Sequence, residues 1–205
     1  IEMLPEDAPY PFAEPTSPAT LVAVLRAGAQ QLVLHHWGDE TRGNNAKFWA
    51  GAGGYPGAGL ARDALALVRD RAPAAAADPF AVEAPQSSSF RLDWRRDYIP
   101  IDAGFSLNKH HGKIQTVGFP LVEVLGALGL GHARPEKIDR LSYRYGVVGR
   151  ETHGDKLLLP PSIVRAALGA SALPFPSRRF RMSLGWPGKE GQARAITTVI
   201  EESRA

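Results

Sequence analysis

The alternation of apolar and polar positions is clearest near the middle of the chain. Phe90, Leu92 and Trp94 alternate with charged residues at the start of the stretch Phe90–Lys113, which is the period of a half-buried strand with a charged outer face. The stretch ends at residues 108–113 in a turn composition with two lysines and two histidines. We expect the rest of the chain to be arranged around this stretch, whose tip faces an anionic partner.

Apolar residues at helical spacing predict four short helices. They extend from Ser17 to about Gln30, across Ala58 to Arg71, from Phe119 to Leu130, and over Ser162–Gly169. The third is apolar on nearly every side, and we expect it to be the buried helix of the fold.

Alternating segments predict further strands at Gln31–Trp37, Ile138–Val148, Arg178–Leu184 and Ala193–Ile200. The last two flank a Gly- and Pro-containing turn and are expected to form a terminal hairpin. Within 138–148, one side carries Ile138, Arg140, Ser142 and Arg144, and the other carries Leu141, Tyr143 and Tyr145. Together these segments predict an α+β fold, with a mainly antiparallel sheet and three or four short helices.

Breaker residues divide the rest of the chain. Residues 1–16 are Pro-rich and acidic and are expected to form an extended arm, and residues 17–205 a single domain. A Gly- and Asn-rich loop is expected from Gly38 to Gly59. An Ala- and Pro-rich connector at 72–85 marks a possible internal boundary. The first residue is Ile1 rather than Met, so we expect a fragment or a processed piece of a longer protein.

Composition narrows the function classes. The chain has 205 residues, 44% of them hydrophobic, and this is enough for a real core. No apolar run has the length of a membrane span, so no membrane partner is expected. Cysteine is absent, which excludes disulfides, thiolate catalysis and Cys-ligated zinc. A reducing cytoplasm is compatible with this composition, and we expect a cytoplasmic protein.

Charge is distributed unevenly. Residues 1–90 carry 6 Lys/Arg against 10 Asp/Glu, whereas residues 91–205 carry 18 against 11. Most of these cations are arginines, whose planar guanidinium suits phosphate oxygens. The alternative is that arginine replaces lysine because of genome base composition. The clustering favours a nucleic-acid partner.

The candidate nucleic-acid-binding residues are basic or amide side chains in loops and strands. They are Arg42, Asn44, Asn45, Lys47, Arg95, Arg96, Lys109, His110, Lys113, Arg179 and Arg181. Arg179, Arg181 and Arg194 share one face if the register of the terminal hairpin follows its turn. Such a row is either a phosphate track or a solvated outer face that pairs with Glu201 and Glu202.

Signatures of catalysis are weak. Two His-His pairs, His35–His36 and His110–His111, would have to converge to bind a metal ion, because adjacent residues of a strand point to opposite faces. The chain contains no HExxH or GxSxG motif and no phosphate-binding loop. We therefore assign no catalytic residue, metal ligand or cofactor. A metal-dependent hydrolase or nuclease that uses these histidines is the alternative function, and a scaffold that contacts only protein subunits is a third.

Several segments together resemble a known family. They are Lys47–Gly51 (KFWAG), Leu92–Lys113 (LDWRRDYIPIDAGFSLNKHHGK), Phe119–Pro135 (FPLVEVLGALGLGHARP) and residues 178–202 (RRFRMSLGWPGKEGQARAITTVIEE). These segments are spread between Lys47 and Glu202. In pattern, rather than in a catalytic motif, they resemble the large-subunit family of type I CRISPR surveillance complexes (Cascade) of subtype I-G, formerly I-U.

The resemblance implies a non-enzymatic subunit of an RNA-guided antiviral complex. Such a subunit would hold the 5′ part of the guide RNA, contact duplex DNA beside the target, and help to recruit a separate helicase-nuclease. Its partners would be guide RNA, target DNA and the other Cascade subunits. Asn44, Asn45 and Lys47 would then touch DNA or the guide backbone, and Lys109 and Lys113 would neutralise phosphates.

Overall fold

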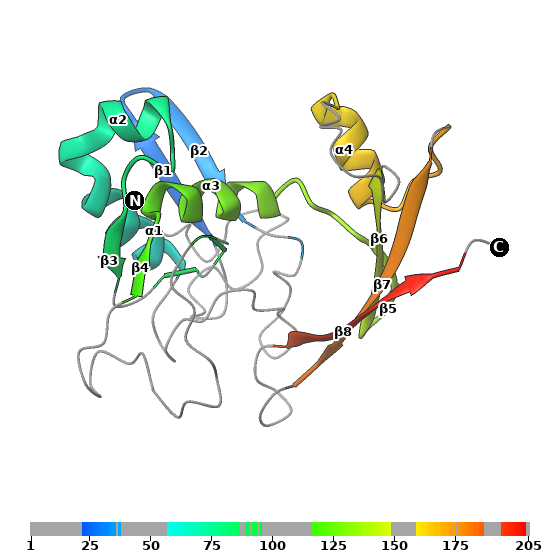
Figure 1. Ribbon diagram of the computed structural model, residues 1–205. Helices are drawn as coiled ribbons and strands as arrows, with labels where there is room; N and C mark the ends of the chain where they lie inside the picture. Colours follow the sequence, from blue (N-terminus) through cyan, green and yellow to red (C-terminus); the bar gives the residue numbers. More distant parts are fainter. Residues whose placement is uncertain are drawn as a thin grey trace.

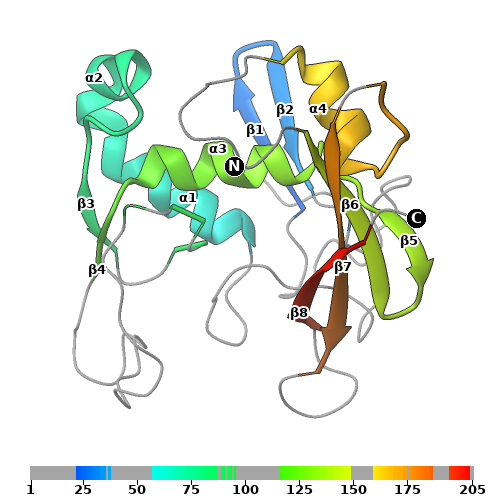
Figure 2. The same cartoon turned by 45° about the vertical axis from the view of Figure 1, so that its right-hand side comes forward.

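The computed structural model describes residues 22–35, 37, 57–86, 89–90, 92–93, 95, 116–148, 159–174, 176–186 and 194–203. Its helices and antiparallel sheets form an α+β fold, as the sequence predicts. Figures 1 and 2 show α1, α2, α3 and the β3–β4 pair on one side of the molecule, and a four-stranded sheet with α4 on the other. The predicted arm at 1–16 lies outside the described residues, and so does the Gly- and Asn-rich loop as far as residue 56.

The first described element is a hairpin and not the predicted helix. β1 (Ala23–Ala27) pairs antiparallel with β2 (Gln30–Leu34). Gly28 occupies the first position of the two-residue turn with φ of +59°, a conformation that glycine adopts without a Cβ penalty. The helical prediction across Ser17–Gln30 is wrong in the described part, because pairing with β2 outweighs a weak local periodicity. The strand predicted at Gln31–Trp37 is confirmed as β2, although β2 ends at Leu34 and Trp37 lies in a turn.

The described chain resumes at Gly57 with two helices. α1 (Gly57–Val68) continues through a short 3-10 helix (Arg69–Arg71) into α2 (Ala72–Ala77). The predicted helix at Ala58–Arg71 is confirmed, but it begins within the last residues assigned to the Gly-rich loop, and these are buried. The connector predicted at 72–85 contains α2 and the start of β3 (Ala84–Gln86). Its Ala75 and Val82 pack with Val68. The domain boundary placed there stays a prediction.

α3 (Pro120–Leu130) is the buried helix that the sequence predicts. Pro120 stands at its first position, where a missing N–H costs no hydrogen bond, and Gly131 caps its end. β4 (Thr116–Gly118) leads into α3 and pairs antiparallel with β3. Gly126 lets α3 approach Leu92, since a Cβ there would lie 3.1 Å from the Leu92 Cβ.

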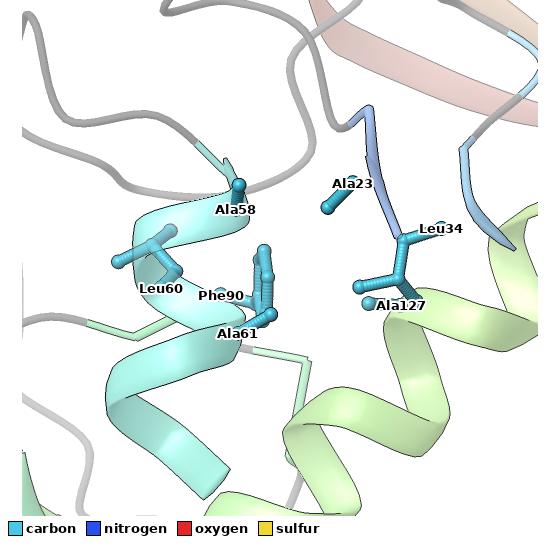
Figure 3. Close-up of a cluster of buried hydrophobic side chains, with 7 residues drawn as sticks. All are labelled: Ala23, Leu34, Ala58, Leu60, Ala61, Phe90 and Ala127. Carbon is cyan, nitrogen blue, oxygen red and sulfur yellow. The ribbon is translucent and has the colours of Figure 1, made fainter. Parts of the chain in front are cut away.

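The main core lies between α1, α3 and the first hairpin. Its buried side chains come from all three elements and from the segment before β4, and Figure 3 shows Phe90 beside α1, facing Leu34 and Ala127. The seven residues are Ala23, Leu34, Ala58, Leu60, Ala61, Phe90 and Ala127. Phe90 is 1% exposed, which confirms its predicted apolar role. However, Asp93, predicted on a charged outer face, is 2% exposed, and residues 89–93 are not a strand where they are described.

The C-terminal sheet has the strand order β5-β6-β7-β8, and all of its pairs are antiparallel. Its strands are β5 (Glu136–Asp139), β6 (Ser142–Val148), β7 (Ser177–Gly185) and β8 (Ala195–Glu202). The single strand predicted at Ile138–Val148 is therefore a tight hairpin, although the assignment of Ser142 and Arg144 to one side and Tyr143 and Tyr145 to the other holds. The predicted terminal hairpin is confirmed as β7 and β8.

A bulge changes the phase of β8. Ser183 pairs with Thr198, but Leu184 pairs with Ile196, so Thr197 is the extra residue. Positions before the bulge therefore swap faces, and Arg194 lies on the face opposite Arg179 and Arg181. It is fully buried and donates a hydrogen bond to the Arg140 carbonyl. The prediction that Arg179, Arg181 and Arg194 share a face is wrong for this reason.

α4 (Pro161–Leu168) starts with a proline and ends before Gly169, as predicted. It packs on β6 at Gly146, where a Cβ would lie only 2.8 Å from the Ala167 carbonyl oxygen. None of the helices in the described part of the chain combines the length and the hydropathy that crossing a bilayer requires.

Candidate nucleic-acid interface

Three of the predicted binding residues are described, and the structure places them in two separate regions. Arg179 and Arg181 lie two positions apart on β7, whereas Arg95 lies in the other half of the molecule, near α2 and α3. The remaining predicted residues lie outside the described residues: Arg42, Asn44, Asn45, Lys47, Arg96, Lys109, His110 and Lys113. Their assignment stays a prediction.

Arg95 is held by contacts within the protein. Its guanidinium carbon lies 3.9 Å from the centre of the Phe80 ring, and its backbone N–H donates to the Asp93 carboxylate at 2.8 Å. Phe80 also meets the Phe119 ring edge-on, with 5.1 Å between centroids. Arg95 is exposed, but this cation–π contact gives it a structural role in joining the segment before β4 to the residues that follow α2.

The strand register gathers arginines on one face of the C-terminal sheet. In the strand register, Arg144 lies opposite Arg181, and Arg179 lies opposite Glu202. Glu136 lies on the same face, opposite Arg144. We call this set of five residues the arginine face. It combines three guanidinium groups with two carboxylates, and therefore carries one net positive charge.

Ion pairs cross all four strands of this face. Glu202 accepts from Arg144 Nε at 2.5 Å and from Arg181 Nε at 2.8 Å, and Arg144 also reaches Glu136 at 3.1 Å. The hydrogen bonds from Arg144, followed by those from Arg181, lower the pKa of the Glu202 carboxyl below its ordinary value. The same bonds, first from Glu202 and then from Glu136, raise the pKa of Arg144. Within the described residues, Arg179 forms no ion pair.

The opposite side of the sheet carries aromatic rings that are not among the predicted binding residues. Tyr145 of β6 and Phe180 of β7 pair across the strands, and their rings are stacked with 5.4 Å between centroids and 18° between planes. We call this side, with Tyr145, Phe180 and Arg178, the aromatic face. Alternation along each predicted strand assigns each ring to one side of its own strand. Only the β6–β7 register shows that the two rings meet.

Arg178 closes one end of this stack. Its guanidinium carbon lies 5.1 Å from the Phe180 ring centre, and the group binds Glu201 through two hydrogen bonds of 2.8 and 2.6 Å. These bonds lower the pKa of the Glu201 carboxyl. A two-point contact with a carboxylate has the same geometry as one with a phosphate, so Arg178 already presents the arrangement that a phosphate would use.

Two buried carboxylates stand at the start of α3, and both are occupied by backbone donors. Glu123 is fully buried and accepts from the N–H groups of Leu92 and Asp93 at 3.0 and 3.2 Å. Asp93 in turn accepts from the N–H of Phe119 at 2.9 Å. These bonds fix the segment before β4 to the positive end of the α3 dipole. The pair therefore links the segment before β4 to the start of α3.

The histidine site of the alternative function is only partly described. His35 packs against Gly131, and its Nδ1 lies 3.4 Å from a guanidinium nitrogen of Arg134. His36, His110 and His111 lie outside the described residues. Among the residues that are described, no three His, Asp or Glu side chains come together in a way that could hold a metal ion.

Comparisons with known proteins add no assignment to this geometry. No family model, curated protein or solved structure matches the chain.

Proposed function

We propose that this chain is a non-enzymatic nucleic-acid-binding subunit of an RNA-guided CRISPR surveillance complex. The observation that carries the binding part is the arginine face, where three arginines and two glutamates lie on one side of the sheet and only Arg144 and Arg181 bind the glutamates in the described part of the chain. The region around it is also cationic, because residues 136–203 carry 11 Lys/Arg against 7 Asp/Glu. The assignment as a subunit of such a complex rests on the resemblance to Cascade large subunits. A cytoplasmic location of the protein, and guide RNA, target DNA and the other subunits as its partners, are part of the same proposal.

Ion pairing on the arginine face is compatible with this function. Exposed ion pairs stabilise a protein by only about 0–1 kcal/mol, because both partners are well solvated. The Arg181 side chain is 50% exposed, so a phosphate group can replace a glutamate oxygen there at little cost. A polyanion would also release the counterions that surround it, which supplies most of the free energy of such binding.

Arg179 is the side chain in the described part with the clearest role. It is exposed, it belongs to the arginine face, and it is not committed to a carboxylate in that part of the chain. The predicted contacts of Lys109 and Lys113 would add to it, and exchanging both lysines for alanine should lower the salt slope of binding by about 1 to 2.

The test is the salt dependence of binding, measured by fluorescence anisotropy with labelled single-stranded RNA and duplex DNA. The intact chain should bind both with an affinity that falls as salt rises, and Arg179→Ala should lower the slope by about 1. Arg62→Ala is the control, because Arg62 is also exposed but pairs with Asp63 on α1. Absence of salt-dependent binding by the intact chain would overturn the nucleic-acid proposal.

A second experiment addresses the assembly. When the chain is produced together with a guide RNA and the other subunits of such a complex, it should co-purify with a short RNA of uniform length. A chain that binds nucleic acid but is recovered without RNA or subunits would be a nucleic-acid-binding protein of another kind.

A further inference from the structure

The aromatic face differs from the rest of the described surface in its chemistry. Tyr145 and Phe180 are half-buried, and they lie among apolar side chains that are more exposed than they are, Val147 at 45% and Val199 at 49%. The register places Val147 on this face opposite Arg178, and Val199 opposite Met182. An apolar strip thus crosses β6, β7 and β8 with a stacked ring pair at its centre.

Protein covers only one end of this face in the described part of the chain. Trp37 packs on Tyr143 with 4.7 Å between ring centroids, and together they cover Met182 and Leu184. α4 lies on the opposite side of the sheet, because Gly146 alternates with Tyr145. The Tyr145–Phe180 end is therefore reached from the side that α4 does not occupy.

The chemistry of this end favours nucleobases. Aromatic side chains on a sheet stack with unpaired bases, whereas the bases of a duplex are stacked on one another and are not accessible to such rings. Arg178 lies over Phe180 and is placed to meet the phosphate next to a stacked base. The excess of cations in residues 136–203 supplies the charge complementarity that an apolar protein partner would not need.

From this arrangement we infer that the aromatic face binds single-stranded nucleic acid, with bases extending the Tyr145–Phe180 stack and a phosphate taking the place of Glu201 on Arg178. The inference rests on the nucleic-acid-binding function proposed above. It adds the class of strand that is bound and the side chains that hold it. RNA and DNA share the chemistry of stacking, and a separate measurement with each strand distinguishes them.

The experiment compares three labelled ligands of equal length with the intact chain: a single strand with bases, an abasic strand with the same phosphates, and a duplex. The single strand should bind most tightly. Phe180→Ala and Tyr145→Ala should each weaken its binding on the order of tenfold and leave the abasic strand unaffected, because stacking needs a base. The single strand is tested as RNA and as DNA.

Two further variants act as controls. Tyr145→Phe keeps the ring and should bind like the parent, which separates stacking from the loss of a hydroxyl group. Glu201→Gln removes the carboxylate that binds Arg178, so it should strengthen binding of every strand and raise the salt slope by about 1. Far-UV circular dichroism and thermal unfolding show whether each variant is folded. Because Glu201→Gln is expected to increase binding, it still tests the inference if an alanine variant does not fold.

The outcomes separate the two proposals. Equal binding of the base-containing and abasic strands by the parent, with the salt slope still sensitive to Arg179→Ala, would overturn the stacking inference and leave the proposed function intact. Unchanged single-strand affinity in folded Phe180→Ala and Tyr145→Ala would have the same meaning. Failure of the parent to bind any of the strands at low salt would overturn both.

Discussion

Carboxylates have different partners in the two halves of the molecule. At the start of α3, Glu123 is fully buried and binds two backbone N–H groups. In the C-terminal sheet, Glu202 is partly exposed and binds the side chains of Arg144 and Arg181. The first arrangement joins two segments away from solvent, because the Glu123 acceptor is fully buried. The second is a partly exposed group of ion pairs in which an external anion can replace a carboxylate, and this difference is the reason for proposing the interface on the sheet.

The largest effect is expected at the buried carboxylate. Glu123→Ala leaves the N–H groups of Leu92 and Asp93 without their acceptor and should lower the free energy of unfolding by about 2–4 kcal/mol, measured by urea denaturation. Leu125→Ala is the matched control, since Leu125 is 46% exposed on the same helix. Its effect should stay within about 0.5 kcal/mol. Equal effects of the two changes would contradict a structural role for Glu123.

The second-largest loss of stability is expected at Gly146, in the C-terminal sheet. Gly146→Ala places a Cβ at 2.8 Å from the Ala167 carbonyl oxygen, so the backbone of α4 must move. We expect a loss of about 1–3 kcal/mol in the free energy of unfolding. Thermal and urea unfolding both measure it. A neutral result would mean that α4 is not seated on β6 as described.

A smaller, pH-dependent effect is expected at the ion pair. The folded pKa of Glu202 lies below its ordinary value of 4.5, so its contribution to stability is complete above that pH and is lost as the pH falls through the lowered value. Glu202→Gln should cost about 1 kcal/mol at neutral pH and flatten the loss of stability on the acid side of pH 4.5. Urea denaturation across a pH series measures both.

Salt sharpens the comparison between the two carboxylates. High salt should shrink the effect of Glu202→Gln, because solvated charges are screened, and should leave that of Glu123→Ala unchanged. If both effects respond equally to salt, the distinction between a buried linkage and an exchangeable ion pair fails.

The smallest expected change is a gain in stability. Gly129 lies exposed in α3, and a Cβ there would meet nothing within 4 Å. Gly129→Ala should therefore raise the free energy of unfolding by about 0.5–1 kcal/mol, since alanine loses less backbone entropy in a helix. It is the counterpart of Gly146→Ala, and a loss of stability in the same urea measurement would show that α3 is packed more tightly than its contacts indicate.

The amino-acid sequence by itself determined the elements whose pattern and boundaries are local. Proline starts and glycine stops predicted α3 and α4, and alternation predicted β7 and β8, because these signals lie within one segment. The cationic character of the second part of the chain was also evident from composition. Arg179 and Arg181 followed directly from alternation along a single strand.

Only the tertiary structure decided what depends on contacts between distant segments. Pairing with β2 made a strand of residues with helical spacing, and the β8 bulge turned Arg194 away from Arg179. The burial of Glu123 and the meeting of Tyr145 with Phe180 likewise required partners from other segments. Register, burial and stacking are properties of two or more elements in space, so no periodicity within one element contains them.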